Sequence, residues 1–235
     1  MRRTSQGELP LHRGTWGGLR PGAGRRPGPN PRVRHLSREK FPGRYPCLVT
    51  LKVREGIGSL RTVAVVKAIE ATFRRGAERG AFRLVHYSVQ GDHLHAIVEA
   101  NGREALGRGM MALAIRFARA VNRGFGRKGP VLRDRYHLRV LRTPSQVRNA
   151  LRYVLLNARR HWAERTGSKA LRGPVRLDPA SSARWFDGWR RDARLAEEAA
   201  QPSDPPAVSR PHTWLLEVGW RRLGLLDPEE IPGPA

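Results

Sequence analysis

Residues 82–100 read FRLVHYSVQGDHLHAIVEA, and this stretch decides the fold. The segments on either side of Gly91-Asp92 are rich in β-branched and aromatic residues, which is typical of strands. Gly91-Asp92 itself is a favoured two-residue turn between antiparallel strands. The pattern therefore predicts a β-hairpin with strands at 82–90 and 93–100.

Two further strands and two helices are predicted around this hairpin. PCLVTLKV at 46–53 and YHLRVLR at 136–142 are apolar and β-rich, which indicates strands. Apolar residues at helical spacing predict a helix between the first strand and the hairpin, with Ser59 as its cap. A longer helix is expected within 101–126.

A third helix is predicted over residues 143–167. Thr143 is its expected cap, Pro144 lies in its first turn, and Gly167 ends it. The predicted order is β-α-β-β-α-β with an additional C-terminal helix, which is an α+β fold with a ferredoxin-like antiparallel sheet. In this arrangement the helices cover one face of the sheet and leave the other face open.

Composition divides the 235 residues into four parts. Residues 1–44 are rich in Gly, Pro and Arg and are predicted to form a disordered basic arm, because they cannot bury enough apolar surface. The α+β domain is expected over 45–167. An irregular extension that contains tryptophan follows at 168–200, and a Pro-rich linker with a short helix at 201–235.

The formal charge of +25 comes almost entirely from arginine, since only five of the 45 basic residues are lysines. Such an excess predicts a polyanionic partner, by default nucleic acid. No apolar run reaches the roughly 18 residues of a membrane span. No secretory signal is recognised, so a cytoplasmic location without a membrane partner is expected. The single cysteine, Cys47, excludes an internal disulfide framework.

Two histidines, His93 and His95, lie in the predicted strand at 93–100. Alternate side chains of a strand point to opposite faces, so both imidazoles share the face away from the core residues Leu94 and Ala96. Two imidazoles on one face can meet a single cation. The other interpretation is a pair of surface histidines on a half-exposed strand.

A possible third group lies on the helix predicted at 143–167. Asn149, Tyr153 and Asn157 follow one another at spacings of four beside an apolar stripe, so they share one side of the helix. If this helix crosses the open sheet face, the amide oxygen of Asn157 can bind a metal and Tyr153 can face whatever the metal holds. Alternatively, Tyr153 is a core tyrosine and Asn157 is solvated.

These residues resemble the REP-associated tyrosine transposases, which are single-tyrosine members of the HUH superfamily. The resemblance rests on His93-Leu94-His95 at the start of a hairpin strand and on Tyr153 with Asn157 four residues later, and it covers residues 45–162. Many relatives carry a histidine in the first strand where this chain has Cys47-Leu48. Many also have proline after the asparagine, whereas Ala158 follows Asn157 here.

The resemblance implies a catalytic domain at 45–167 that cleaves and rejoins single-stranded DNA. It implies that Tyr153 is the nucleophile and forms a 5′-phosphotyrosine link, and that His93, His95 and Asn157 bind Mg²⁺ or Mn²⁺. The implied partner is single-stranded or hairpin DNA in the bacterial nucleoid, bound by a monomer or a homodimer. His137 is a candidate for orienting the site, with a plain strand histidine as the alternative.

Basic residues on or after the second and third helices are candidate phosphate contacts, with a solvated helix face as the alternative. They are Arg108, Arg116, Arg119, Arg123, Arg127, Lys128, Arg152, Arg159 and Arg160. Three aromatic residues, Trp185, Phe186 and Trp189, either stack on unpaired bases or, as we favour, pack against the domain.

Three functions are compatible with the sequence. The first is a metal-dependent transposase or DNA endonuclease acting through Tyr153. The second is a non-catalytic module that binds single-stranded nucleic acid, derived from such an enzyme. The third is a metal-dependent hydrolase in which water is the nucleophile and Tyr153 is incidental.

Overall fold

The structure is a computed structural model that describes residues 41–76, 78–167, 175–190 and 205–233. The chain divides into two units, Met1–Glu39 and Lys40–Ala235, and every described residue belongs to the second. All but the last four residues of the expected basic arm lie outside the described residues. The expected boundaries at residues 44, 167 and 200 therefore stay predictions.

The main elements follow the order expected for a ferredoxin-like fold. They are β1 (Cys47–Lys52), α1 (Val63–Arg74), β2 (Glu78–Arg79), β3 (Phe82–Val89), β4 (His93–Ala100), α2 (Arg103–Gly124), β5 (His137–Val140) and α3 (Pro144–Thr166). The sheet order is β2-β3-β4-β1-β5, and every neighbouring pair is antiparallel. The prediction of an α+β, ferredoxin-like fold is confirmed. The two-residue edge strand β2 was not predicted.

The ends of the helices depend on local capping groups. The Thr143 side chain accepts a hydrogen bond from the Gln146 amide, Pro144 opens α3, and Gly167 ends it with a positive φ of 65°. The expected cap of α1 was wrong. The side chain of Thr62, not that of Ser59, accepts a hydrogen bond from the Val65 amide in the first turn of α1.

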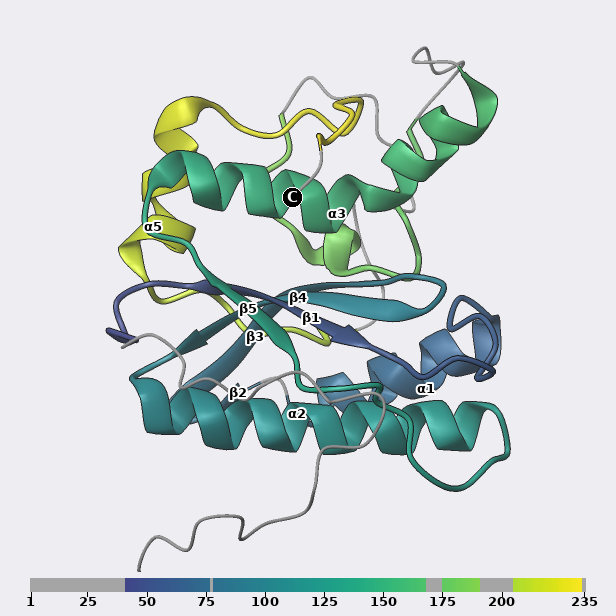
Figure 1. The fold of residues 1–235 in the computed structure, drawn as a ribbon. Helices are drawn as coiled ribbons and strands as arrows, with labels where there is room; N and C mark the ends of the chain where they lie inside the picture. The colour runs from purple at the N-terminus through teal and green to yellow at the C-terminus, as the bar shows by residue number, and fades with distance from the viewer. Residues whose placement is uncertain (1–40, 77, 168–174, 191–204, 234–235) are drawn as a thin grey trace, which may run out of the picture. The chain divides into compact units, whose positions relative to one another are not determined.

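The two faces of the sheet contribute to separate cores (Figure 1). On one face, Leu94, Ala96 and Val98 of β4 pack with buried residues of α1 and α2. On the other, Ile97 packs with Leu48 and the apolar side of α3. The alternation predicted for β4 is therefore correct, but the second face is not open, because α3 covers it.

The C-terminal segments also pack on the α3 side. They form η1 (Ser182–Trp185), α5 (Trp214–Glu217) and η2 (Gly219–Leu223). Trp220 is fully buried there and stacks on Phe186, whose ring also meets Trp189 edge to face. Trp185 packs partly buried against the other core. Core packing, the favoured interpretation of Trp185, Phe186 and Trp189, is what the structure shows.

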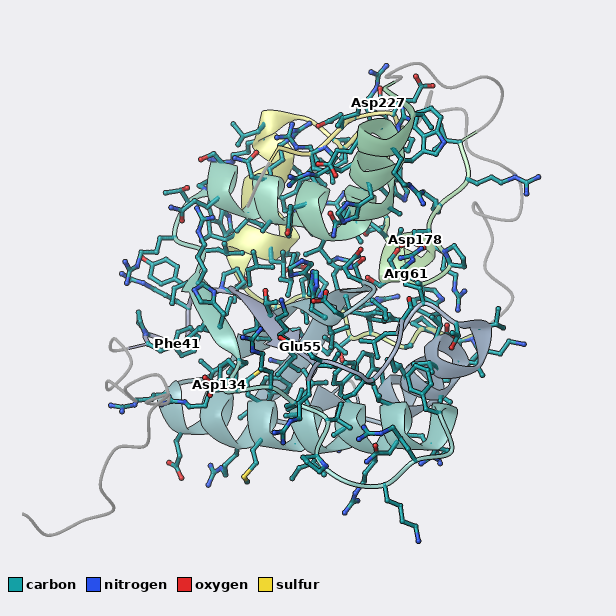
Figure 2. All side chains as sticks on the ribbon, turned by 45° about the vertical axis from the view of Figure 1, so that its right-hand side comes forward. Phe41, Glu55, Arg61, Asp134, Asp178 and Asp227 are labelled. Carbon is teal, nitrogen blue, oxygen red and sulfur yellow. The ribbon has the colours of Figure 1, made fainter. Side chains whose placement is uncertain are left out.

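Two polar contacts attach these segments to the sheet. Arg61 and Asp178 face one another in Figure 2, and both guanidinium nitrogens donate to the carboxylate over 2.9 and 2.7 Å. The buried Glu99 accepts hydrogen bonds from the amides of His212 and Thr213 and from the Thr213 hydroxyl. The C-terminal segments are therefore fixed to both ends of β4.

Candidate active site

The histidine pair lies at the start of β4 on the face covered by α3. The register of β1 with β4 places Thr50 opposite His95 and Lys52 opposite His93. Residues paired across antiparallel strands point to the same face, so these four side chains lie together. Ile97, two residues further along, is part of the core beneath α3. The pair is therefore enclosed between the sheet and the helix.

Each imidazole has one nitrogen occupied by a neighbouring polar group. His93 Nδ1 lies 2.6 Å from Asp92 Oδ1, and His95 Nδ1 lies 3.0 Å from the Thr50 hydroxyl. Asp92 also pairs with Lys52. When Nδ1 carries the proton in both rings, both Nε2 atoms are lone-pair acceptors. A carboxylate or hydroxyl behind the imidazole is the usual support of a metal-binding histidine.

The two Nε2 atoms face each other at 2.9 Å, and the rings meet edge to face. Two lone pairs this close repel each other unless a proton or a cation lies between them. The contact is short enough for one ring to donate a hydrogen bond to the other, and it also brings two imidazole nitrogens within reach of one cation.

Tyr153 reaches this pair from α3. Its hydroxyl oxygen lies 3.1 Å from His95 Nε2, and the two ring centroids are 4.8 Å apart. The sequence alone left open whether α3 crosses the histidines, and this contact shows that it does. The phenol is half-buried between helix and sheet.

Asn157 lies one helical turn after Tyr153 and is almost completely buried, with 2% of its surface exposed. The interpretation as a solvated helix residue is therefore wrong. Asn157 is not among the described residues that have fully buried side-chain atoms without a hydrogen-bond partner. Its candidacy as a ligand therefore rests on its position one turn after Tyr153.

The same residues fit a metal only together with ligands from outside the protein. Over the part of the chain that the structure describes, no group of three or more His, Cys, Asp and Glu side chains is arranged to hold an ion. Two imidazoles and one amide would leave the remaining positions to water or to phosphate oxygens. The donor set is thus suited to an open site.

Burial shifts the protonation of this cluster. Burial lowers the pKa of His95 to about 3, and the neighbouring His93 adds to the effect, so the His95 imidazole is neutral at pH 7. The hydrogen bond from His93 holds the pKa of Asp92 below its ordinary value. Burial raises the pKa of Tyr153, while the positive charge of Arg160 opposes part of that rise.

Hollows adjoin both the histidines and the tyrosine. One, of about 430 Å³, is lined by His93, Arg61, His161 and Arg165. Another, of about 250 Å³, is lined by Tyr153 together with residues of β5 and the first half of α3. The histidine and the tyrosine are therefore each accessible from a hollow.

The predicted phosphate contacts on α2 lie across the sheet from this site, because α2 packs on the opposite face (Figure 1). Arg116 donates to the Gly76 carbonyl, and Arg127 to Asn122 and the Pro130 carbonyl, so both have structural partners. Exposed side chains in this set are Arg108, Arg119, Arg123 and Lys128. The sheet therefore separates these four side chains from Tyr153.

The predicted contacts on α3 lie closer to the site but are engaged. Arg152 donates to Glu230, and Arg160 donates to Glu164 over 2.8 Å. Arg159 is buried against the Trp162 ring, and burial lowers its pKa.

His137, the candidate orienting residue, lies in the same row of the sheet as His95. Thr50 of β1 pairs with His95 on one side and with His137 of β5 on the other. Two strand spacings, about 10 Å, therefore separate the two histidines. His137 is exposed and does not touch the histidine pair directly.

Two supporting groups were not singled out from the sequence. Thr50 supports His95 from a strand whose register no local pattern reveals. His161 lies four residues after Asn157, in the hollow beside His93, and its Nδ1 lies 3.1 Å from Glu164. His161 continues the spacing of four residues that runs through Tyr153 and Asn157, so helical periodicity in the sequence could have identified it.

Comparison with known proteins gives only distant structural likeness. No family model matches the chain, and no curated protein matches it. A REP-associated tyrosine transposase bound to a REP hairpin aligns with 55% of this chain and 74% of its own, at 17% identity and a TM-score of 0.42. A bacterial tRNA(His) guanylyltransferase-like protein in complex with GTP aligns with 55% of this chain and 66% of its own, at 14% identity and a TM-score of 0.39. Likeness at this level does not identify a chemistry.

No helix in the described ranges has both the length and the apolar character needed to cross a membrane.

Proposed function

We propose that this protein is a metal-dependent single-stranded DNA endonuclease and strand transferase, a transposase-type enzyme with Tyr153 as its nucleophile. The observation that carries the proposal is the approach of the Tyr153 hydroxyl to His95 Nε2, which itself faces His93 Nε2. These contacts support the proposal because a hydroxyl of α3 meets two imidazoles of β4, and the buried amide of Asn157 lies one turn further along α3. The high positive charge of the chain supports an anionic substrate.

The residues of the chain have distinct roles in this proposal. His93, His95 and Asn157 hold the ion, and Asp92 and Thr50 keep the imidazoles in the binding tautomer. A bound Mg²⁺ or Mn²⁺ would reduce the charge on a non-bridging phosphate oxygen and orient the phosphate. Tyr153 attacks that phosphate from α3.

The covalent step exchanges one phosphate ester for another. The bond from the Tyr153 oxygen to phosphorus forms, and the bond from phosphorus to the 3′ oxygen breaks. The phenol proton passes to water, and the 3′ oxygen takes a proton from water. The 5′-phosphotyrosine link preserves the ester, so a 3′-hydroxyl can later attack it and rejoin a strand.

The test uses labelled single-stranded oligonucleotides that carry hairpins with randomised flanks. With Mn²⁺, the full chain is expected to give a protein–DNA adduct that survives denaturation. Tyr153→Phe abolishes the adduct, whereas Tyr136→Phe, which removes the hydroxyl of a tyrosine packed on the opposite core of the sheet, retains it.

The alternatives predict different products. Cleavage without an adduct that persists in Tyr153→Phe would show a hydrolase that uses water. Binding without cleavage by any flank in the pool would show a non-catalytic module. Titration with Mn²⁺ checks the metal ligands separately: His93→Ala and His95→Ala lose binding, and Tyr153→Phe keeps it.

A further inference from the structure

A hollow of about 730 Å³ opens at the end of β4 remote from His93. Its volume lies within the range of about 300–1,000 Å³ that is usual for small-ligand sites. Residues 43–45, the last residues of β4, the start of α3 and the start of α5 form its walls. We call it the β4-end pocket.

The pocket presents aromatic surface that is held in place. Trp214 lines it and is 50% exposed, although large aromatic side chains are usually buried. Gly219 lies so close to the Trp214 ring that a Cβ there would be 2.7 Å from it. The Arg222 guanidinium lies 5.1 Å from the same ring centre. An indole fixed at the surface in this way provides a flat face for stacking.

The charge of the pocket is positive. Arg44 and Arg142 are exposed at its wall, and Arg83 also lines it. Its single acidic residue, Glu99, has both carboxylate oxygens engaged with the backbone at residues 212 and 213. The surroundings therefore favour an anion beside the aromatic surface.

The pocket adjoins the candidate active site along the flank of α3. Arg142 lines the β4-end pocket, and its neighbour Leu141 lines the hollow that also contains Tyr153. Pro144 at the pocket and Tyr153 are nine residues apart on α3, which corresponds to about 14 Å along the helix axis. About two and a half turns also place the two residues on opposite sides of α3, so a strand from Tyr153 would reach the pocket by passing round the start of this helix.

We propose that the β4-end pocket binds an unpaired nucleotide of single-stranded DNA. The base stacks on Trp214, and Arg44 and Arg142 contact the flanking phosphates. Stacking platforms combined with positive charge are the usual means of holding unpaired strands.

The proposal does not depend on cleavage, so binding is measured in the Tyr153→Phe background with EDTA. The probe is a fluorescent 12-nucleotide deoxythymidine strand, followed by anisotropy at 150 mM salt. Trp214→Ala is expected to weaken binding about 5- to 100-fold, and Trp214→Phe to retain most of it. Arg142→Ala weakens binding and reduces the number of counterions released on binding, measured from the salt dependence of the affinity, by about one. Arg75→Ala, which removes an exposed arginine at the end of α1, is the matched control and leaves binding near wild type.

Cross-linking locates the base independently of affinity. A strand with 5-iododeoxyuridine, irradiated on the protein, is expected to cross-link to Trp214 or Tyr45, as mapped by mass spectrometry. Unchanged binding by Trp214→Ala, together with cross-links confined to other regions, would overturn the proposal. Equal affinity for thymidine monophosphate would instead make the pocket a mononucleotide site, and tighter binding of oligouridine would make it an RNA site. Both results would also overturn it. A failure of the adduct assay leaves these measurements unaffected, so the two proposals fail separately.

Discussion

The ion pair between Arg61 and Asp178 fixes the C-terminal extension beside the histidine hairpin. Arg61 donates to both Asp178 oxygens and to the Val89 carbonyl at the end of β3. Arg61 also lines the hollow that contains His93. Asp178→Asn keeps the size of the side chain and replaces one accepting oxygen by an NH₂ group that faces a guanidinium donor.

The expected cost follows from the burial of the pair. The Asp178 side chain is 4% exposed and that of Arg61 is 35% exposed. A hydrogen bond to a charged group contributes about 1.5–3 kcal/mol, and more is lost when a buried partner is left facing a like group. Because Arg61 is partly solvated, we take the lower part of that range and expect the substitution to reduce the free energy of unfolding by about 1.5–2 kcal/mol.

Urea unfolding of wild type and Asp178→Asn, followed by tryptophan fluorescence, measures this difference. Asp227→Asn is the matched control, because Asp227 pairs with Arg190 over 2.9 Å while the Arg190 side chain is 49% exposed. Asp227→Asn should reduce the free energy of unfolding by less than about 1 kcal/mol. If both variants lost the same free energy, the Arg61–Asp178 pair would not fix the extension and the reasoning from burial would be refuted.

Three further outcomes are expected. In α2, Gly107→Ala should stabilise the protein by about 1 kcal/mol, because the added methyl group meets no other atom. Gly109→Ala should destabilise it, because the methyl group would overlap the Phe82 ring. The melting temperatures of the two variants should therefore shift in opposite directions. Burial lowers the pKa of His86 from 6.5 to about 4. The neutral imidazole therefore contributes fully to the free energy of unfolding above pH 6.5, and about 3 kcal/mol of that free energy is lost as the pH falls toward 4. In urea unfolding at pH 7 and pH 4, His86→Gln should lose correspondingly less free energy of unfolding than wild type. Burial raises the pKa of Cys47 to about 12 and leaves none of its surface exposed, so a thiol reagent should label it only after unfolding, and rapid labelling of the native protein would contradict this.

Features encoded by neighbouring residues were predictable from the sequence. The limits of β4 and α3 follow from the turn at Gly91, the cap at Thr143 and the stop at Gly167. The cap of α1 was not predictable in this way, because Ser59 and Thr62 are both capable capping residues. Long-range packing decides between them: the Leu60 amide donates to the Gly91 carbonyl, which keeps residues 59–61 in the loop against the hairpin turn.

The candidate site was only partly predictable for the same reason. Strand alternation placed His93 and His95 on one face, and helical spacing placed Tyr153 with Asn157. The support of His95 by Thr50 depends on the register of β1 against β4, which no local pattern specifies. The contacts of Glu99 with residues 212 and 213 join positions more than 110 residues apart, so only the folded chain reveals them.

The carboxylate of Glu230 has a consequence for the release of a bound strand. It accepts hydrogen bonds from Arg148 and Arg152, and Arg152 lines the hollow beside Tyr153. Removal of the last nine residues would leave two guanidinium charges uncompensated on the flank of α3. Each uncompensated charge lengthens the residence of a polyanion. In the proposed reaction, a shortened chain would thus capture DNA more readily yet dissociate from its product more slowly, and the Glu230 carboxylate would favour turnover over retention.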